Sequence, residues 1–140
     1  MLSFGKQVDL LGYDIISSRI NPGEELVLAL YWKFLQPLPP KSKISMSLRD
    51  EKGQVEQSSQ TSLFNDYFSL NQISSGIVVR DVHRLKTESG LKLGHYQIVL
   101  ECLVHDKGKA LQVRDSKGNS QGEQAIVGDV DIASSKLDLD

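Results

Sequence analysis

Hydrophobic and polar residues alternate with a period of two along much of this chain. In the segment EELVLALYWKF the even positions carry leucines, Trp32 and Phe34, whereas the odd positions include Glu25 and Lys33. The segment KISMSLRD, residues 43–50, repeats the pattern. Because successive side chains of a β-strand point to opposite faces of the sheet, this alternation predicts strands with one buried face.

Turn signals separate the alternating segments. Residues 21–24 read NPGE, and residues 50–53 place Asp first and Gly fourth, an arrangement typical of β-turns. No segment has the 3.6-residue periodicity of an amphipathic helix. We therefore predict an all-β protein, an immunoglobulin-like antiparallel β-sandwich of seven or eight strands. The predicted strands are residues 6–17, 25–35, 43–50, 54–60, 77–86, 95–105, 110–114 and 124–132.

The alternation also predicts which side chains form the core between the two sheets. With 140 residues, the chain is expected to fold as one domain, residues 1–132, followed by a frayed acidic tail, residues 133–140. The side chains expected to be nearly inaccessible to solvent are Leu28, Leu30, Trp32, Met46, Leu48, Ile98, Leu100 and Cys102.

Charge and composition argue against several classes of protein and of binding partner. The chain carries 16 basic and 18 acidic residues, a net charge of −2, which argues against a nucleic-acid partner held by a broad basic field. One cysteine allows no internal disulfide. No apolar run approaches the ~20 residues that cross a bilayer, and the N-terminus lacks a signal-peptide pattern. The chain as given is therefore expected to be soluble.

The segment LGHYQIVLECLVHDKGKALQV gathers His95, Cys102, His105 and Asp106, which raises the question of a metal or catalytic site. Alternation places Cys102 on the face opposite the two histidines. The histidines share a face, but ten residues at about 3.3 Å each separate them by roughly 33 Å. We therefore predict no shared site and a buried, unreactive Cys102.

Tyr96 follows Gly94 by two residues at the start of an alternating strand. This spacing is typical of a tyrosine corner, in which the tyrosine hydroxyl binds backbone where the chain crosses between sheets. The alternative is an ordinary core tyrosine.

Asp81 and His83 point to the same face of one predicted strand. A carboxylate that orients an imidazole is an arrangement seen in general bases. No nucleophile or oxyanion loop accompanies the pair, so a polar pair at the rim of a sheet is the favoured interpretation. Asp129 and Asp131 are interpreted as the solvated face of the last strand. Since no metal-ligand or phosphate-loop motif occurs, we predict no metal and no cofactor.

The long loop at residues 59–76 is the one segment whose composition suggests a ligand. Aromatic rings there could stack on sugar rings while amide and carboxylate groups bind hydroxyls. The alternative is that the rings cover an open end of the sandwich. The candidate ligand-binding residues are Phe64, Asn65, Asp66, Tyr67 and Phe68.

Several fragments, taken in order, resemble a known domain family: FGKQVDLLGYDI, INPGEELVLALYW, LRDEKGQV, SGIVVRDVHRL, LKLGHYQIVLECLVHDKGKAL and AIVGDVDI. They resemble the C-terminal β-sandwich domain of bacterial membrane glycosyltransferase-like proteins, relatives of the dolichyl-phosphate-mannose protein mannosyltransferases. The PGE turn, the Asp-x-x-Gly turn and the Gly-x-Tyr strand give a weaker similarity to the glycan-binding C-terminal domain of the O-antigen ABC transporter ATPase.

The resemblance implies a domain on the extracytoplasmic side of the inner membrane that carries no catalytic residues of its own. The expected function is that of a non-catalytic accessory or binding domain of envelope glycan metabolism. Its expected partners are a glycan or lipid-linked sugar, or a membrane protein or parent chain, and not nucleic acid. The alternative is a purely structural or protein-interaction domain.

Overall fold

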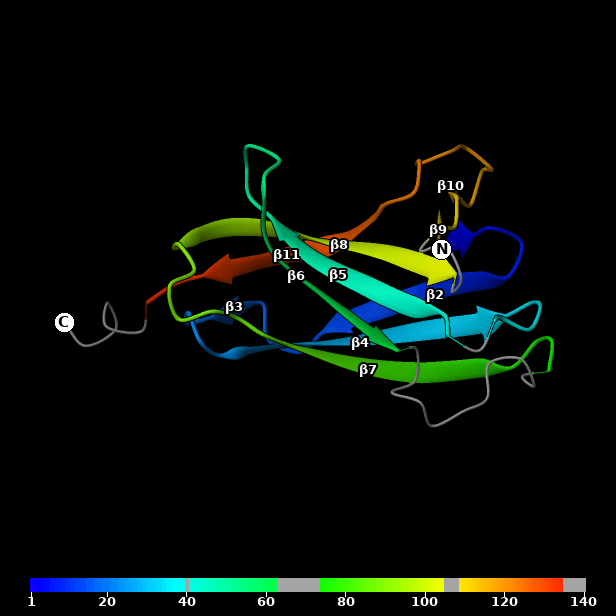
Figure 1. Ribbon diagram of the computed structural model, residues 1–140, viewed down its shortest axis with the longest axis horizontal. Helices are drawn as coiled ribbons and strands as arrows, with labels where there is room; N and C mark the ends of the chain where they lie inside the picture. Colours follow the sequence, from blue (N-terminus) through cyan, green and yellow to red (C-terminus); the bar gives the residue numbers. More distant parts are fainter. Residues whose placement is uncertain (40, 63–73, 105–108, 135–140) are drawn as a thin grey trace.

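The computed structural model describes residues 1–39, 41–62, 74–104 and 109–134, which form two stacked β-sheets without a helix (Figure 1). The predicted all-β antiparallel sandwich is thus confirmed. Its strands are β1 (Leu2–Phe4), β2 (Val8–Ile15), β3 (Arg19–Ile20), β4 (Glu25–Phe34), β5 (Lys43–Arg49), β6 (Val55–Ser62), β7 (Val78–Lys86), β8 (Gly94–Val104), β9 (Lys109–Ala110), β10 (Val113–Asp115) and β11 (Ala125–Ile132).

The two sheets divide the strands between them. The first sheet has the order β10-β1-β2-β4-β7, and the second has the order β3-β11-β8-β5-β6, with β9 paired to β8. All of these pairings are antiparallel except that of β11 with β3. Figure 1 shows β5, β8 and β11 in one layer and β2, β4 and β7 in the other. The apolar core lies between these layers.

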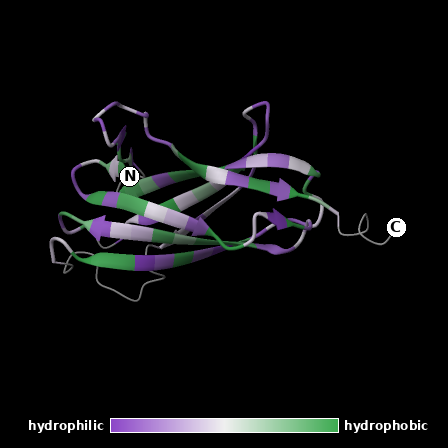
Figure 2. Ribbon diagram, turned by 180° about the vertical axis from the view of Figure 1, so that it is seen from behind, coloured by the Kyte–Doolittle hydropathy of each residue, from purple (hydrophilic) through white to green (hydrophobic). Residues whose placement is uncertain are grey.

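The core residues predicted from alternation are buried. Leu28, Leu30, Trp32, Leu48, Ile98, Leu100 and Cys102 are 0% exposed and Met46 is 3% exposed. The banding of hydropathy along the strands in Figure 2 reflects this division between inner and outer faces. The Trp32 ring meets Phe4 edge to face, with the ring centroids 5.4 Å apart. Each large apolar side chain buried in this way contributes about 1.5–3 kcal/mol to folding.

The structure has more strands than the sequence predicted, because short segments pair at the sheet margins. Eleven strands form instead of seven or eight. Four of them, β1, β3, β9 and β10, have only two or three residues, too few to display alternation. The predicted strand at residues 110–114 is divided between β9 and β10, which belong to different sheets.

A β-bulge in β2 reverses the direction of its side chains. Leu10 pairs with Trp32, but the next pairs along the strand are Gly12 with Tyr31 and Tyr13 with Leu30. Leu11 is therefore the extra residue, and odd positions face the other sheet after it. As a result, Tyr13 and Ile15 lie against Gly128 of β11. The sequence predicted one continuous strand over residues 6–17 and missed this reversal.

The tyrosine corner is confirmed. The Tyr96 hydroxyl donates a hydrogen bond of 2.8 Å to the carbonyl oxygen of Lys92. This bond fixes the connection between β7 in the first sheet and β8 in the second, and Tyr96 is only 3% exposed. The start of β8 is therefore held in a defined position.

The close approach of β2 to Gly128 gives a stability prediction. A Cβ at Gly128 would lie 2.7 Å from Cδ1 of Ile15 and 3.2 Å from Cε2 of Tyr13. We expect Gly128→Ala to lower the free energy of unfolding by about 1–3 kcal/mol, because the crowded side chains must shift. The matched control is Gly94→Ala, where φ is also positive, 152° against 156° at Gly128, but the added Cβ would meet no atom within 4 Å. Equal losses for the two variants in urea unfolding would contradict this account.

Candidate functional site

The five residues predicted to bind a ligand, Phe64, Asn65, Asp66, Tyr67 and Phe68, lie outside the described residues, within 63–73. Their role therefore stays a prediction. His105 and Asp106 also lie outside the described part of the chain.

Cys102 is a buried core residue, as predicted. Its side chain faces the opposite sheet and is 0% exposed. Burial raises the pKa of the Cys102 thiol to about 12. The thiolate, which is the reactive form, is therefore scarce at neutral pH, and no substrate reaches the sulfur. Cys102 contributes to packing only.

Asp81 and His83 form a polar pair on β7, the edge strand of the first sheet, as favoured from the sequence, but their side chains point into the sandwich and are buried. Both side chains are 1% exposed, and Nε2 of His83 is 2.6 Å from Oδ2 of Asp81. The same Oδ2 accepts a bond of 3.3 Å from Nε1 of Trp32. On the other side of the ring, Nδ1 of His83 is 2.8 Å from Oγ1 of Thr61. The four residues form a buried chain, here named the Trp32–Thr61 chain.

The chemical nature of the groups fixes which atoms donate and which accept the hydrogen bonds in the Trp32–Thr61 chain. An ionised carboxylate can only accept hydrogen bonds, and an indole N–H can only donate them. When Asp81 is ionised, Nε2 of His83 must therefore donate to it, which leaves Nδ1 to meet the Thr61 hydroxyl. A hydroxyl, an imidazole and a carboxylate stand in the order of a catalytic triad, but the burial of the imidazole keeps substrate away. The arrangement satisfies polar groups within a core, and every buried side-chain N or O atom among the described residues has a partner.

The same side of the sandwich carries a second cross-link between β6 and β7. Nε2 of Gln57 donates to the carbonyl oxygen of Lys86 at 2.7 Å, and the backbone N–H of Glu88 donates to Oε1 of Gln57 at 3.1 Å. Because β6 and β7 are the edge strands of different sheets, these bonds and the Thr61–His83 contact tie the two sheets together at this edge.

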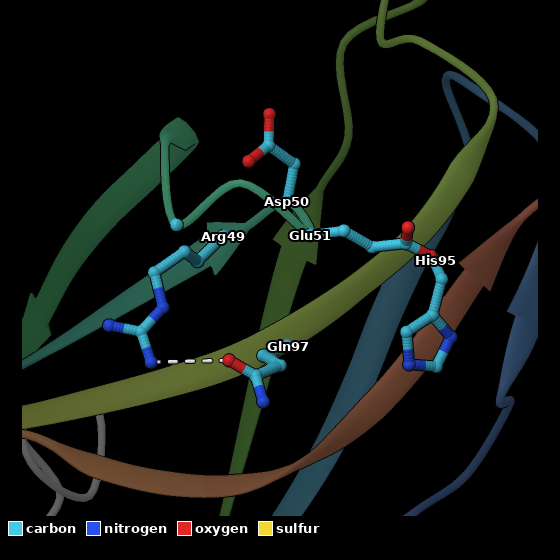
Figure 3. Close-up of a pocket in the computed structure, with 6 residues that line it drawn as sticks. Arg49, Asp50, Glu51, His95 and Gln97 are labelled. Atoms are coloured by element: carbon cyan, nitrogen blue, oxygen red, sulfur yellow. Dashed lines mark hydrogen bonds between the residues drawn. The ribbon is translucent and has the colours of Figure 1, made fainter.

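An open groove lies where the β5–β6 hairpin stands beside β8. Two adjoining cavities, of about 370 and 330 Å³, share Asp50, Glu51 and His95. We name them together the hairpin groove. Figure 3 shows the first cavity, with Arg49 and Gln97 bonded to each other and Glu51 extending toward His95. The other lining residues are Lys52, Gly53, Gln54, Glu56, Lys92, Leu93, Gly94 and Tyr96.

The turn that forms one wall of the groove is held by the Asp50 side chain. Oδ1 of Asp50 accepts the backbone N–H groups of Lys52 and Gln54, both at 2.9 Å. The hydrogen bond from Gln54 is the main cause that holds the pKa of Asp50 below its usual value. Gly53 supplies the left-handed backbone that the turn needs, with φ of 82°. The hairpin is therefore a fixed wall, and its Asp50 carboxylate is already engaged.

His95 lies at the other end of the groove between two carboxylates of β11. Its Nδ1 is 2.8 Å from Oδ1 of Asp131, and its Nε2 is 3.1 Å from Oδ1 of Asp129. The hydrogen bond to Asp131, followed by the bond to Asp129, raises the pKa of His95 above its ordinary value of 6.5. The sequence analysis assigned the two aspartates to a solvated face, which is where they lie, but missed their contact with His95 because the pairing of β8 with β11 is not visible in the sequence.

The groove combines engaged and available polar groups. Nη2 of Arg49 donates to Oε1 of Gln97 at 3.2 Å, which leaves the other guanidinium N–H groups directed to solvent or a ligand. The carboxylate of Glu51 makes no hydrogen bond or ion pair with the described residues. The sequence analysis identified residues 50–53 only as a turn, because Arg49 and Gln97 come together through strand pairing.

The described residues do not supply a metal site. In the ranges given above, no three His, Cys, Asp or Glu side chains are arranged to hold an ion. The prediction that the protein binds no metal stays a prediction. The described part of the chain also contains no helix of the length and hydrophobicity that crossing a membrane requires.

Comparison with known proteins reveals likeness of fold at low sequence identity. No protein-family model matches the chain, and no curated protein matches its sequence. The C-terminal domain of Wzt superposes with a TM-score of 0.58 at 10% identity, covering 96% of this chain and 78% of that one.

Two further solved structures share the architecture. A Niemann-Pick type C2 protein from Japanese carpenter ant matches with a TM-score of 0.54 at 7% identity, over 95% of this chain and 99% of that chain. The alkylpurine DNA glycosylase AlkC of Pseudomonas fluorescens, bound to DNA containing an abasic site analog, matches with a TM-score of 0.50 at 15% identity, over 94% of this chain and 32% of that one. At these identities the comparisons establish the fold of the chain.

The Trp32–Thr61 chain gives a test by double-mutant cycle. The single variants are Asp81→Val and His83→Leu. Asp81→Val leaves the indole N–H of Trp32 and Nε2 of His83 buried without this acceptor, so we expect it to cost about 3–5 kcal/mol of unfolding free energy. The double variant Asp81→Val/His83→Leu removes both members of the pair and should cost clearly less than the sum of the single variants. Asp14→Ala is the control, because Asp14 accepts a bond from Tyr31 at an exposed position. If the loss of unfolding free energy in the double variant, measured in urea, equalled the sum of the losses in the single variants, the two side chains would not be coupled and this account would be wrong.

The two carboxylates beside His95 give a test by titration. We expect an NMR pH titration of the His95 ring to give a midpoint above 6.5, and Asp131→Asn to lower it more than Asp129→Asn. Because the pKa is raised in the folded state, the stabilisation by His95 is fully present below pH 6.5 and is lost as the pH rises through the folded pKa. A midpoint at or below 6.5 in the unmodified protein would be inconsistent with the paired geometry.

Proposed function

We propose that this chain is a non-catalytic glycan-binding module. The observation that carries the proposal is the hairpin groove, an open site of ligand size in which Arg49 and Glu51 retain unused hydrogen-bonding capacity. Binding sites for small molecules commonly measure about 300–1,000 Å³ and use a few placed polar groups for orientation. Sugar hydroxyls both donate and accept hydrogen bonds, so they match a guanidinium and a carboxylate together.

The likeness of fold and the likeness of sequence motifs both support a glycan-binding module. The fold is shared with the C-terminal domain of Wzt, and the sequence resembles the glycan-binding C-terminal domain of the O-antigen transporter ATPase. The likeness of the backbone path and the likeness of the turn motifs both support a binding module of that kind.

The chemistry of the described residues supports a module without catalysis. The one pair of the general-base type, Asp81 with His83, is buried, and the Cys102 thiol is protonated and inaccessible. His95 is accessible, but carboxylates contact both of its ring nitrogens, so neither nitrogen is free to accept a proton from a substrate.

We further propose that the module works with a membrane glycosyltransferase on envelope glycans or lipid-linked sugars, at the extracytoplasmic side of the inner membrane. This context rests on the sequence resemblance. The partner would be a parent chain or a separate membrane protein that carries the catalytic residues.

A structural or protein-interaction domain is the second candidate. The observation that favours it is the exposure of several large apolar side chains, among them Leu11 on β2 and Ile126 on β11, which are 40% and 51% exposed. Exposed apolar surface of this kind is common at protein contacts.

A panel of oligosaccharides separates the two candidates. We expect isothermal titration calorimetry to detect binding of at least one of three classes, neutral, acidic and amino tetrasaccharides, with a Kd on the order of 1 mM to 1 μM. No tetrasaccharide should be cleaved on prolonged incubation. Absence of binding in all three classes by protein that circular dichroism shows to be folded would overturn the proposal and favour the interaction domain.

A further inference from the structure

The hairpin groove has room for more than one polar contact with a ring-shaped ligand. Its two cavities adjoin along Glu51 and His95, so the open space runs from the Arg49–Gln97 pair on the outer face of the second sheet to the loop at Lys92–Gly94. The Asp50 turn and the Tyr96 corner fix the two walls. A ligand therefore meets a site that is already formed, which limits the entropy lost on binding.

The available groups in the groove are of opposite charge. Arg49 offers guanidinium N–H groups beyond the one bonded to Gln97, and Glu51 offers a carboxylate without a protein partner among the described residues. In Figure 3 they project from the same hairpin, with Glu51 extending toward His95 and Asp50 turned away. Sugar hydroxyls can donate to the carboxylate and accept from the guanidinium, because a hydroxyl has both capacities.

The charge around the groove disfavours an acidic ligand. Arg49, Lys52 and Lys92 are its fixed cations, and Asp50, Glu51 and Glu56 are its acids. Two further acids, Asp129 and Asp131, contact His95. An acidic sugar would gain Arg49 but would also face Glu51, a like charge that costs affinity.

Hydrogen bonding rather than ring stacking must supply the specificity. Tyr96 is the one aromatic residue that lines the groove among the described residues, and it is 3% exposed with its hydroxyl bonded to Lys92. Leu93 is 58% exposed and supplies a small apolar contact for the C–H face of a sugar. Without a stacking platform, the position of each hydroxyl decides whether the sugar fits.

We propose that the hairpin groove prefers an uncharged sugar unit to an acidic one, with Glu51 accepting and Arg49 donating hydrogen bonds to its hydroxyls. This inference rests on the proposed function and adds to it the class of sugar and the residues that recognise it. Gln97 acts as a positioning residue, because its amide oxygen holds the Arg49 guanidinium at 3.2 Å.

The test compares neutral and acidic probes on the unmodified chain and on charge-removing variants. The probes are gluco-, galacto- and manno-configured tetrasaccharides as the neutral set, and tetragalacturonate as the acidic one. We expect at least one neutral probe to bind more tightly than tetragalacturonate. Glu51→Gln and Arg49→Gln should each weaken binding of that probe roughly tenfold, the loss typical of a hydrogen bond to a charged group.

Glu51→Gln should also narrow the preference for neutral over acidic sugar, because it removes the repelling carboxylate. The matched controls are Glu25→Gln and Arg84→Gln, which remove an exposed Arg–Glu pair of the first sheet whose closest atoms are 3.7 Å apart. Both controls should bind the neutral probe as the unmodified chain does. Thermal unfolding of each variant checks that the sandwich is intact.

Tighter binding of tetragalacturonate than of every neutral probe would overturn the class of sugar. Unchanged affinity in both groove variants, with glycan still bound, would overturn the site and leave the proposed function standing. A failure of all these probes and of the amino tetrasaccharides to bind would instead remove the proposed function, and this inference with it.

Discussion

The shared apolar layer between the two sheets is the constraint on which the rest of the molecule depends. Each long strand turns one set of side chains into that layer, and Trp32 lies fully buried within it, against Phe4. Burial on this scale leaves no place for an unpaired polar group. Asp81 and His83 are tolerated there because they bind each other, Trp32 and Thr61. The buried chain is therefore a consequence of the core and also a link between the sheets, since Thr61 and His83 belong to different ones.

A filled core moves the available chemistry to the margins of the sandwich. The hairpin groove forms where the β5–β6 turn stands beside the start of β8, and each of its walls is fixed by local hydrogen bonds. The stable layer holds Arg49 and Gln97 in register on adjacent strands, and the turn that follows carries Glu51. A rigid scaffold with polar groups presented at one end suits recognition, and nothing in the described residues brings an accessible nucleophile to a base.

The parts of the structure that follow from local alternation were predictable from the sequence. Leu28, Leu30 and Trp32 are buried as expected because a strand allows only two faces. The tyrosine corner was predictable for a similar reason, since Gly94 and Tyr96 have a fixed spacing. Alternation also placed Asp81 and His83 together on the face that carries Leu85, and β7 is an edge strand as expected, but the burial of the pair was not predicted.

What the sequence could not provide were features that depend on pairing between distant segments. The bulge at Leu11 is visible only in the register of β2 against β4. The contacts of His95 with Asp129 and Asp131 depend on the pairing of β8 with β11. The groove was missed for the same reason, because its residues come from β5, the following turn and β8. The aromatic loop that the sequence did favour lies outside the described residues, so the two candidate sites are open to a direct comparison.

That comparison can be made by NMR, by mapping the chemical-shift changes of backbone amides when an oligosaccharide that binds the protein is added. In a two-dimensional ¹H–¹⁵N spectrum of the full chain saturated with the tightest-binding tetrasaccharide, the account predicts shifts concentrated at residues 49–54 and 92–97. Residues 78–86, in the first sheet, should not move. Shifts concentrated at residues 63–73, with the groove unchanged, would contradict the claim that the hairpin groove is the glycan-binding site.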